Sequence, residues 1–318
     1  MQIDVFNGDA DGICALIQLR LAEPKFSQLI SGVKRDICLL ENVRANSDNE
    51  ITVLDISMKA NQAYLLPLLE KNVPIFYADH HQSGEIPLHS NLNALIDTDA
   101  DICTSLIINR YLKNRFAEWA IVGAFGDNLA VSAMTLARQF NFSEMKLQQL
   151  KMLGVHLNYN AYGDHINELN FNPCELYQQL VVYDSPFKFI VENSAINQQL
   201  LSCYENDIEK ARQQMPEYES DKALLYILPN TAWARRVSGT FGNELAIKNP
   251  NKAHAILTEK DNGNYQVSVR APLNLKTGAD ELCSQFSTGG GRKAAAGINE
   301  LEKESFNHFF SLYLKNYN

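Results

Sequence analysis

The sequence lacks the paired cysteines that a zinc site or a redox dithiol requires. Its six cysteines are widely separated, and no two of them form a CxxC motif. No apolar run approaches the ~20 residues that span a bilayer, and the start of the sequence shows neither the basic nor the long apolar region of a secretory signal. These absences favour a reduced, cytoplasmic protein without a membrane partner.

Positive charge is also scarce. The 318 residues include 28 Lys and Arg against 37 Asp and Glu, which gives a net charge of −9. Because affinity for long DNA or RNA comes largely from Lys and Arg that neutralise phosphates, this balance argues against a long nucleic acid as the main partner. A local basic pocket for a short phosphorylated ligand remains open, and an excess of carboxylates suits a site for divalent cations.

The length and composition are those of an ordinary globular protein. With 46% hydrophobic and 20% charged residues, a chain of this length predicts about two domains and a sizeable core. We expect a first domain over residues 1–195, a helical linker over 196–220 and a second domain over 221–318. The sequence leaves the oligomeric state open.

Strands alternate with helices in the first half of the chain. Strands are predicted over 2–6, 51–55 and 73–78, and helices over 13–21 and 60–71. This alternation is typical of βαβ units and predicts a mainly parallel sheet flanked by helices. Further helices are predicted over 101–117, 119–140 and 143–153. Because ligands of open α/β sheets gather at the carboxyl ends of the strands, the residues after each strand are the first candidates for a site.

The second half predicts a smaller α/β domain. A helical pattern over 196–215 ends at Pro216, and strands are expected over 223–228, 253–259 and 265–270. The sequence Asp261-Asn262-Gly263-Asn264 between the last two strands is a strong hairpin signal. A glycine-rich loop and a terminal helix are expected to follow.

The first acidic cluster, NGDADG over 7–12, directly follows the first predicted strand. Two carboxylates that lie two residues apart in a tight turn can point at neighbouring metal ions. Gly8 and Gly12 would permit the backbone angles that such a turn needs. The alternative is a surface turn or a helix N-cap formed by Asp9 or Asp11.

Three more clusters follow the same pattern. Asp55 ends the second predicted strand, and Asp79-His80-His81 follows the third. Asp55 alone also fits a strand-to-helix cap, and the histidines could be a half-exposed structural pair. However, histidine is the commonest metal ligand, and a carboxylate often orients it. Asp127 lies among apolar neighbours, where an acid is costly to bury without a partner.

A single site for divalent ions would explain all four clusters. Oxygen ligands combined with one imidazole suit manganese or magnesium better than zinc or copper. Two such ions about 3.5–4 Å apart are the usual device for phosphoryl hydrolysis, because they polarise the phosphate and generate hydroxide.

These motifs resemble those of the DHH phosphoesterase family. The matching segments occur in order as NGDADG (7–12), VLDIS (53–57), ADHH (78–81) and FGD (125–127), and GGGRKAAAG (289–297) resembles the signature of the DHH-associated C-terminal domain, usually GGGH followed by AAG. The likeness extends over nearly the whole chain. It implies a DHH catalytic domain with a mainly parallel sheet and a smaller C-terminal α/β domain that binds the substrate.

The resemblance also implies a set of metal ligands. Asp9 and Asp11 would each hold one of two divalent ions, manganese in the first instance and magnesium as the alternative. Asp55 would bridge both ions, and His80 and Asp127 would complete the ligands of the second.

Three neighbouring residues complete the implied centre. His81 would face the substrate phosphate, and Asp79 would orient the histidines. Asn7 stands where the family has a histidine or aspartate ligand. As a neutral and weaker ligand, it implies that the first ion binds loosely or with an extra water.

The implied substrate contacts lie in the C-terminal domain. Gly289, Gly290 and Gly291 would let backbone N–H groups approach phosphate oxygens, although a tight turn is the simpler interpretation. Arg270 matches a substrate-binding arginine of the family, or is a solvated strand residue. Arg292 replaces the usual histidine; its planar fork could clamp a phosphate or pair with a guanine, or it could buttress the surface.

Together these features predict a two-metal phosphodiesterase that cleaves short oligoribonucleotides or linear dinucleotides to mononucleotides, with pGpG as a substrate if Arg292 reads guanine. The alternatives are a single-strand exonuclease, a cyclic-dinucleotide phosphodiesterase and a phosphatase of small phosphates or polyphosphate. A degenerate nucleotide-binding module, suggested by Asn7 and Arg292, is the alternative that is not an enzyme.

Overall fold

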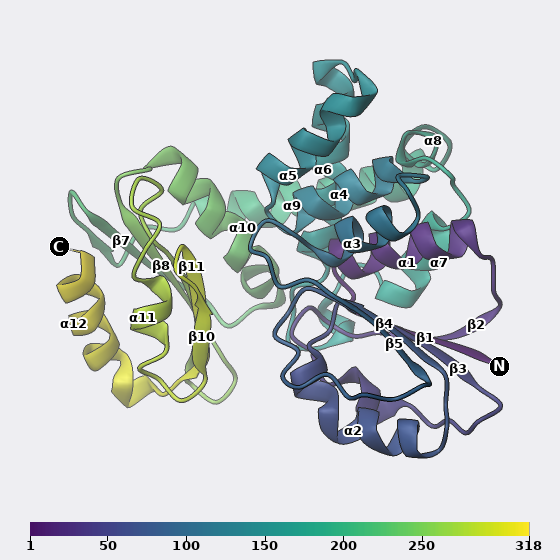
Figure 1. The fold of residues 1–318 in the computed structure, drawn as a ribbon. Coiled ribbons are helices and arrows are strands. Elements are labelled where there is room, and N and C mark those ends of the chain that lie inside the picture. Colours follow the sequence, from purple (N-terminus) through teal and green to yellow (C-terminus); the bar gives the residue numbers. More distant parts are fainter. Residues whose placement is uncertain (318) are drawn as a thin grey trace. The chain divides into compact units, whose positions relative to one another are not determined.

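Figure 1 shows a computed structural model of the chain, which describes residues 1–317. The chain divides into two compact units, Met1–Ser202 and Cys203–Asn318. Among the described residues, no helix is both long and apolar enough to cross a membrane.

The first unit is built around a five-stranded sheet in which every strand pair is parallel. The strands run in the order β2 (Ser27–Ile30), β1 (Gln2–Phe6), β3 (Glu50–Leu54), β4 (Ile75–Asp79) and β5 (Leu92–Ile96). Phe6 pairs with Leu54, and Leu54 with Ala78. The carboxyl ends of the three central strands therefore lie side by side, and the segments that follow them share one edge of the sheet.

Helices cover both faces of this sheet (Figure 1). On one face α1 (Ala10–Ala22) and α3 (Thr104–Tyr111) contact the strands, and α4 (Ala117–Gly126) and α6 (Glu144–Asn160) pack against α1 in the same hydrophobic core. The other face packs against α2 (Met58–Glu70). The central strands β1 and β3 are buried on both faces, as expected for parallel strands covered by helices on either side. The remaining helices of this unit are α5 (Ala130–Ala137), α7 (Pro173–Leu180), α8 (Pro186–Glu192) and the start of α9 (Ser194–Arg212).

The helix expected over 119–140 is not continuous. It ends at Gly126, and a new helix, α5, begins at Ala130 after Asn128 adopts a left-handed conformation with φ 62°. The helix expected over 101–117 is the shorter α3, whereas the one expected over 143–153 extends to Asn160. The break between α4 and α5 leaves Asp127 at the end of α4.

The second unit contains a six-stranded mixed sheet. Its order is β10 (Gly289–Arg292), β11 (Ala295–Leu301), β9 (Tyr265–Arg270), β8 (Ala253–Glu259), β7 (Ala223–Leu228) and β6 (Tyr218–Glu219). Only β7 and β8 pair in parallel, and α10 (Ala232–Lys248) connects them along the chain. The expected hairpin forms between β8 and β9. The helices α11 (Ala279–Cys283) and α12 (Phe306–Tyr317) complete the core of this unit.

Candidate metal centre

Four aspartates and one histidine meet at the carboxyl ends of β1, β3 and β4. They are the five charged ligands expected from the sequence, Asp9, Asp11, Asp55, His80 and Asp127. The Nε2 atom of His80 lies 3.5 Å from Asp55 Oδ1 and 4.0 Å from Asp127 Oδ2. Thr104 joins two of the carboxylates, since its backbone N–H donates to Asp11 and its hydroxyl donates to Asp55.

Asp9 is the N-cap of α1, as the alternative interpretation of its motif proposed. One of its carboxylate oxygens accepts from the N–H groups of Asp11 and Gly12, at 2.9 and 3.1 Å. The other oxygen accepts from the ammonium group of Lys34. Although burial opposes ionisation, Lys34 and the Gly12 N–H lower the pKa of Asp9 to about 2. The carboxylate is therefore charged and fully engaged.

The glycines of this motif allow neighbouring backbone segments to approach closely. The sequence predicts instead that they permit unusual backbone angles. Neither Gly8 nor Gly12 has a positive φ. A Cβ atom on Gly8 would lie 2.1 Å from the carbonyl oxygen of Gly32, and one on Gly12 would lie 2.2 Å from that of Asn7. Gly8 thus lets the segment before Lys34 approach the turn that carries Asp9, and Gly12 lets the start of α1 approach Asn7.

Asp11 binds the N-terminus of α3. Its two carboxylate oxygens accept from the N–H groups of Thr104 and Ser105, each at 2.7 Å. Free N–H groups at a helix N-terminus, together with the helix dipole, favour an anionic partner. The side chain is almost completely buried.

Asp55 has a left-handed backbone conformation, with φ 62°. Such a conformation costs on the order of 1–3 kcal/mol for a residue other than glycine, and it is concentrated at functional sites. Burial raises the pKa of Asp55 well above its ordinary value, and the carboxylates of Asp11 and Asp9 raise it further. The negative charge of the carboxylates in the buried centre therefore exceeds the positive charge that the neighbouring side chains supply.

The orientation of His80 makes it a good metal ligand. Its Nδ1 is within 2.9 Å of the carbonyl oxygen of Ile102, so this nitrogen carries the proton and Nε2 is left to face Asp55 and Asp127. Metal-ligating histidines commonly donate their second N–H in this way. Among residues 1–317, Asp127 Oδ2 accepts no hydrogen bond although it is buried. Asp55, His80 and His81 each offer one ligand atom within 4.8 Å of the others, a group that fits a divalent cation, and Asp127 Oδ2 lies 4.0 Å from His80 Nε2.

His81 lies beside His80 and is oriented by Asp79. Its Nδ1 is 2.7 Å from Asp79 Oδ1, and its side chain is 43% exposed. Burial alone would lower the pKa of His81, but the carboxylate of Asp79 raises it. The sequence predicts that Asp79 orients both histidines. In the structure it bonds His81 alone, because the Ile102 carbonyl holds His80.

Asn7 does not present its amide to the centre. Its Oδ1 accepts from the N–H of Asp9 at 3.2 Å, and its Nδ2 donates to the carbonyl of Lys34 at 3.1 Å. Both the oxygen and the nitrogen of the buried amide therefore form hydrogen bonds with the backbone.

Lys34 belongs to the centre although the sequence analysis did not identify it. Its Nζ contacts Asp9, lies 3.1 Å from Asn158 Oδ1 and lies 3.7 Å from Asp127 Oδ1. Lys34 follows β2, a short, partly exposed strand that was not predicted. Recognising that strand would have placed Lys34 at the same sheet edge as the other residues.

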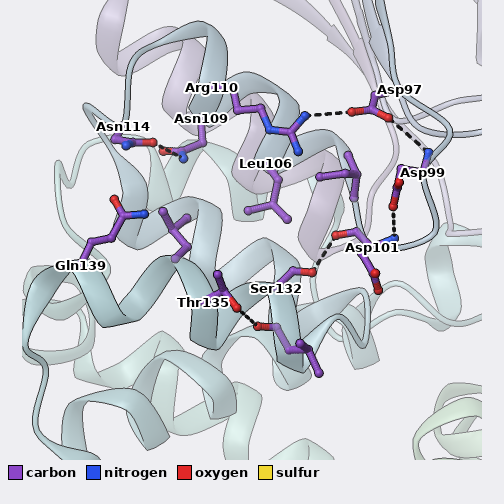
Figure 2. Close-up of a pocket in the computed structure, with 13 residues that line it drawn as sticks. Asp97, Asp99, Asp101, Leu106, Asn109, Arg110, Asn114, Ser132, Thr135 and Gln139 are labelled. Carbon is purple, nitrogen blue, oxygen red and sulfur yellow. Dashed lines mark hydrogen bonds and ion pairs between the residues drawn. The ribbon is translucent and has the colours of Figure 1, made fainter.

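A pocket of about 700 Å³ adjoins the segment that holds His80 (Figure 2). Asp97, Asp99 and Asp101 line one side of it. Each of the last two donates its backbone N–H to the preceding aspartate, and Ser132 donates to the carbonyl of Asp101 at 2.7 Å. These bonds hold the chain just before Ile102, whose carbonyl orients His80.

The residues expected to contact substrate lie in the second unit. Arg270 is half-buried, and it donates to Asn243 Oδ1 at 2.7 Å and to Ser268 Oγ at 3.0 Å. The glycine-rich segment is a strand, β10, rather than a loop. Gly291 has φ 144°, and a Cβ there would lie 2.5 Å from the Cα of Ala296. Arg292 is exposed at the end of this strand.

No family model and no curated protein matches the sequence, but several solved structures match the fold. An exonuclease RecJ bound to manganese is 18% identical, with a TM-score of 0.58 over 98% of this chain and 89% of that chain. A pGpG-specific phosphodiesterase, PggH from Vibrio cholerae, is 14% identical, with a TM-score of 0.55 over 99% and 97%. The chain therefore shares its fold with exonuclease RecJ and with a pGpG-specific phosphodiesterase.

Two further solved structures share this fold. RecJ from Thermus thermophilus in complex with Mn²⁺ is 17% identical, with a TM-score of 0.55 over 98% of this chain. This chain covers 51% of that protein, so it spans about half its length. CDC45 from Entamoeba histolytica is 7% identical, with a TM-score of 0.54 over 99% of this chain and 95% of that chain.

Proposed function

We propose that the protein is a divalent-metal-dependent phosphodiesterase that hydrolyses short oligoribonucleotides or linear dinucleotides to mononucleotides. The observation that carries the proposal is the arrangement of Asp55, His80 and Asp127. Two carboxylates and one imidazole nitrogen converge at the carboxyl ends of the sheet, and a buried carboxylate oxygen lacks a partner within the described chain. This is a ligand set for manganese or magnesium, on a fold shared with nucleases and a phosphodiesterase.

The residues around this ligand set have distinct tasks. Asp55, His80 and Asp127 would hold an ion, which supplies Lewis acidity to the phosphate and a nucleophilic hydroxide. His81, partly exposed and hydrogen-bonded to Asp79, would donate its Nε2 proton to a phosphate oxygen or to the leaving oxygen. The sequence predicts two manganese ions. The contacts of Asp55, His80 and Asp127 support one of them.

A short substrate is favoured over a long strand. The net charge of −9 gives a long polyanion little general attraction. In the second unit, the exposed Arg292 is our candidate for binding the substrate. All six cysteines are free, which is compatible with the cytoplasmic location that we propose.

A single-strand exonuclease is the second candidate, because the two RecJ structures share this fold. The likeness in fold does not distinguish the two activities, but substrate length does. A processive exonuclease gains contacts from a long strand, whereas a dinucleotide enzyme does not.

The experiment that tests the proposal is a hydrolysis panel with metal-free protein to which Mn²⁺ or Mg²⁺ is added. The substrates are pGpG, pApA, a pentanucleotide, a 20-residue single strand and a cyclic dinucleotide. We expect the highest kcat/KM for substrates of two to five nucleotides and none without metal. Asp127→Asn should abolish this activity, whereas Asp184→Asn, on the exposed surface, should retain it. Efficiency that keeps rising up to the 20-residue strand would instead establish the exonuclease.

A further inference from the structure

The ammonium group of Lys34 lies among oxygen atoms of the kind that bind a metal cation. Its ammonium group contacts the carboxylate of Asp9 and lies 3.1 Å from the amide oxygen of Asn158 and 3.7 Å from a carboxylate oxygen of Asp127. The ring of Tyr162 lies 5.8 Å away. The two carboxylates and the amide oxygen thus surround Nζ as oxygen ligands would surround a divalent ion.

The main chain holds Lys34 in this place. Its N–H donates to the carbonyl of Ala161 at 2.9 Å, and its carbonyl accepts from Asn7 at 3.1 Å. Gly8 allows the segment before it to approach closely, because any side chain there would collide with Gly32. The charge is therefore built into the centre rather than carried by a mobile surface side chain.

Lys34 lies beside Asn7, whose side-chain amide donates to the Lys34 carbonyl at 3.1 Å. Asn7 replaces a histidine or aspartate of the family pattern, and its amide is turned to the backbone. Where the pattern has aspartate, this change removes one negative charge. An ammonium group in place of a divalent ion removes one positive charge. The two departures therefore balance in charge.

We propose that the Lys34 ammonium replaces the first of the two metal ions, so that this protein binds one divalent ion, at Asp55, His80 and Asp127. The proposal rests on the metal-binding part of the proposed function and not on the identity of the substrate. Lys34 then fixes the ionised carboxylate of Asp9 and supplies positive charge where a first ion would otherwise lie.

Metal stoichiometry tests this proposal directly. The full chain is freed of metal with a chelator and titrated with Mn²⁺ in a calorimeter, and bound metal is measured by elemental analysis. We expect one ion per wild-type chain. The double variant Asn7→Asp/Lys34→Met, which restores the carboxylate and removes the ammonium, should bind two. Lys25→Met removes a lysine that pairs with Glu23 and Glu50 at the surface, and it should bind one.

Electron paramagnetic resonance gives a second readout. At saturation, wild-type protein should show the six-line spectrum of isolated Mn²⁺. Two ions about 3.5–4 Å apart in the double variant should couple and broaden these lines. Two ions in the wild-type chain would overturn the proposal. A double variant that is folded by circular dichroism and still binds one ion would also overturn it.

The failure of this proposal can be told apart from that of the proposed function. One ion per chain with no hydrolysis of any substrate would reject the phosphodiesterase and support the role of Lys34. Hydrolysis by a wild-type protein that holds two ions would do the reverse. Absence of any bound ion would reject both.

Discussion

The imidazole Nδ1 of His80 lies 2.9 Å from the carbonyl oxygen of Ile102. A backbone carbonyl, unlike the carboxylate that orients His81, is present whatever side chain the residue carries. The two adjacent histidines are thus oriented by different groups, and their roles can be separated experimentally.

Replacement of His80 should affect metal binding, and replacement of His81 should affect turnover. We expect His80→Ala to weaken Mn²⁺ binding by at least about tenfold, because it removes a ligand from the set formed with Asp55 and Asp127. His81→Ala should leave Mn²⁺ affinity within a few-fold of wild type and lower kcat by roughly 10²–10⁴-fold, the usual contribution of a proton donor. Calorimetry and steady-state kinetics distinguish the two. Equal loss of metal affinity in both variants would make His81 a ligand.

Asp79→Asn should change the pH dependence of His81. The carboxylate of Asp79 raises the pKa of His81 against the opposing effect of burial. The amide lacks this charge, so the pKa should fall, and less His81 is protonated at neutral pH. If protonated His81 donates to the substrate, the alkaline limb of the kcat profile should move to lower pH. An NMR titration of the ring protons checks the pKa itself, and an unchanged alkaline limb would remove His81 from proton transfer.

The sequence predicts the central strands well because each is buried on both faces. Residues 2–6, 51–55 and 73–78 match β1, β3 and β4 to within two residues. The rule that ligands gather at strand ends then leads to Asp9, Asp55 and His80. The edge strands β2 and β5 are partly exposed and have no comparable apolar signal. Lys34, which follows β2, was missed for this reason.

Other features depend on tertiary contacts that no local pattern encodes. The sequence is mainly apolar on both sides of Asp127-Asn128, because α4 and α5 contribute to one core. The break in the helix at Asn128 places Asp127 at the metal centre. Helical periodicity in the sequence does not reveal this break. Similarly, three glycines favour a loop on intrinsic propensity, yet pairing with β11 makes them a strand.

Removing one partner of the buried ion pair of Arg20 and Asp4 should strongly destabilise the first unit. Two guanidinium nitrogens donate to Asp4, at 2.8 and 2.5 Å, and both residues are almost fully buried. Removing one partner leaves an uncompensated buried charge, so Arg20→Met should cost about 3–5 kcal/mol. Lys188→Met, which breaks an exposed pair with Asp184, should change stability far less, because water screens the charges of an exposed pair. Urea denaturation measures both.

A double variant tests whether the loss comes from the unpaired charge. Arg20→Met/Asp4→Leu removes both charges, so it should be more stable than Arg20→Met alone. A double variant that is no more stable than the single one would assign the loss to packing.

His254 should make the second unit sensitive to acid. Its side chain is fully buried, and within residues 1–317 neither ring nitrogen has a hydrogen-bond partner. Burial, together with Lys252 and Arg270, lowers its pKa from 6.5 to about 4. Between these two pH values the unfolded chain takes up a proton that the folded chain does not, so stability is full above pH 6.5 and falls as pH decreases. The loss is on the order of 3 kcal/mol by pH 4.

Thermal unfolding between pH 7.5 and 4 measures this effect. His254→Leu should flatten the pH dependence of the melting temperature, because the group that takes up the proton is gone. His308→Gln, at an exposed position, should leave the dependence unchanged. A wild-type slope that persists in His254→Leu would assign the acid sensitivity to other groups.

The last prediction tests whether Arg292 reads a base or holds a phosphate. Arg292 is exposed at the end of β10, where its planar fork is available to a ligand. A guanine-reading arginine discriminates by about 1–3 kcal/mol against the wrong base, whereas phosphate contacts are the same for every dinucleotide. We therefore expect Arg292→Ala to lower kcat/KM for pGpG at least about fivefold more than for pApA. Arg292→Lys should not restore the preference, since a point charge lacks the two parallel donors. Equal losses on both substrates would assign Arg292 to the phosphate, and a guanine preference would then have to come from other residues.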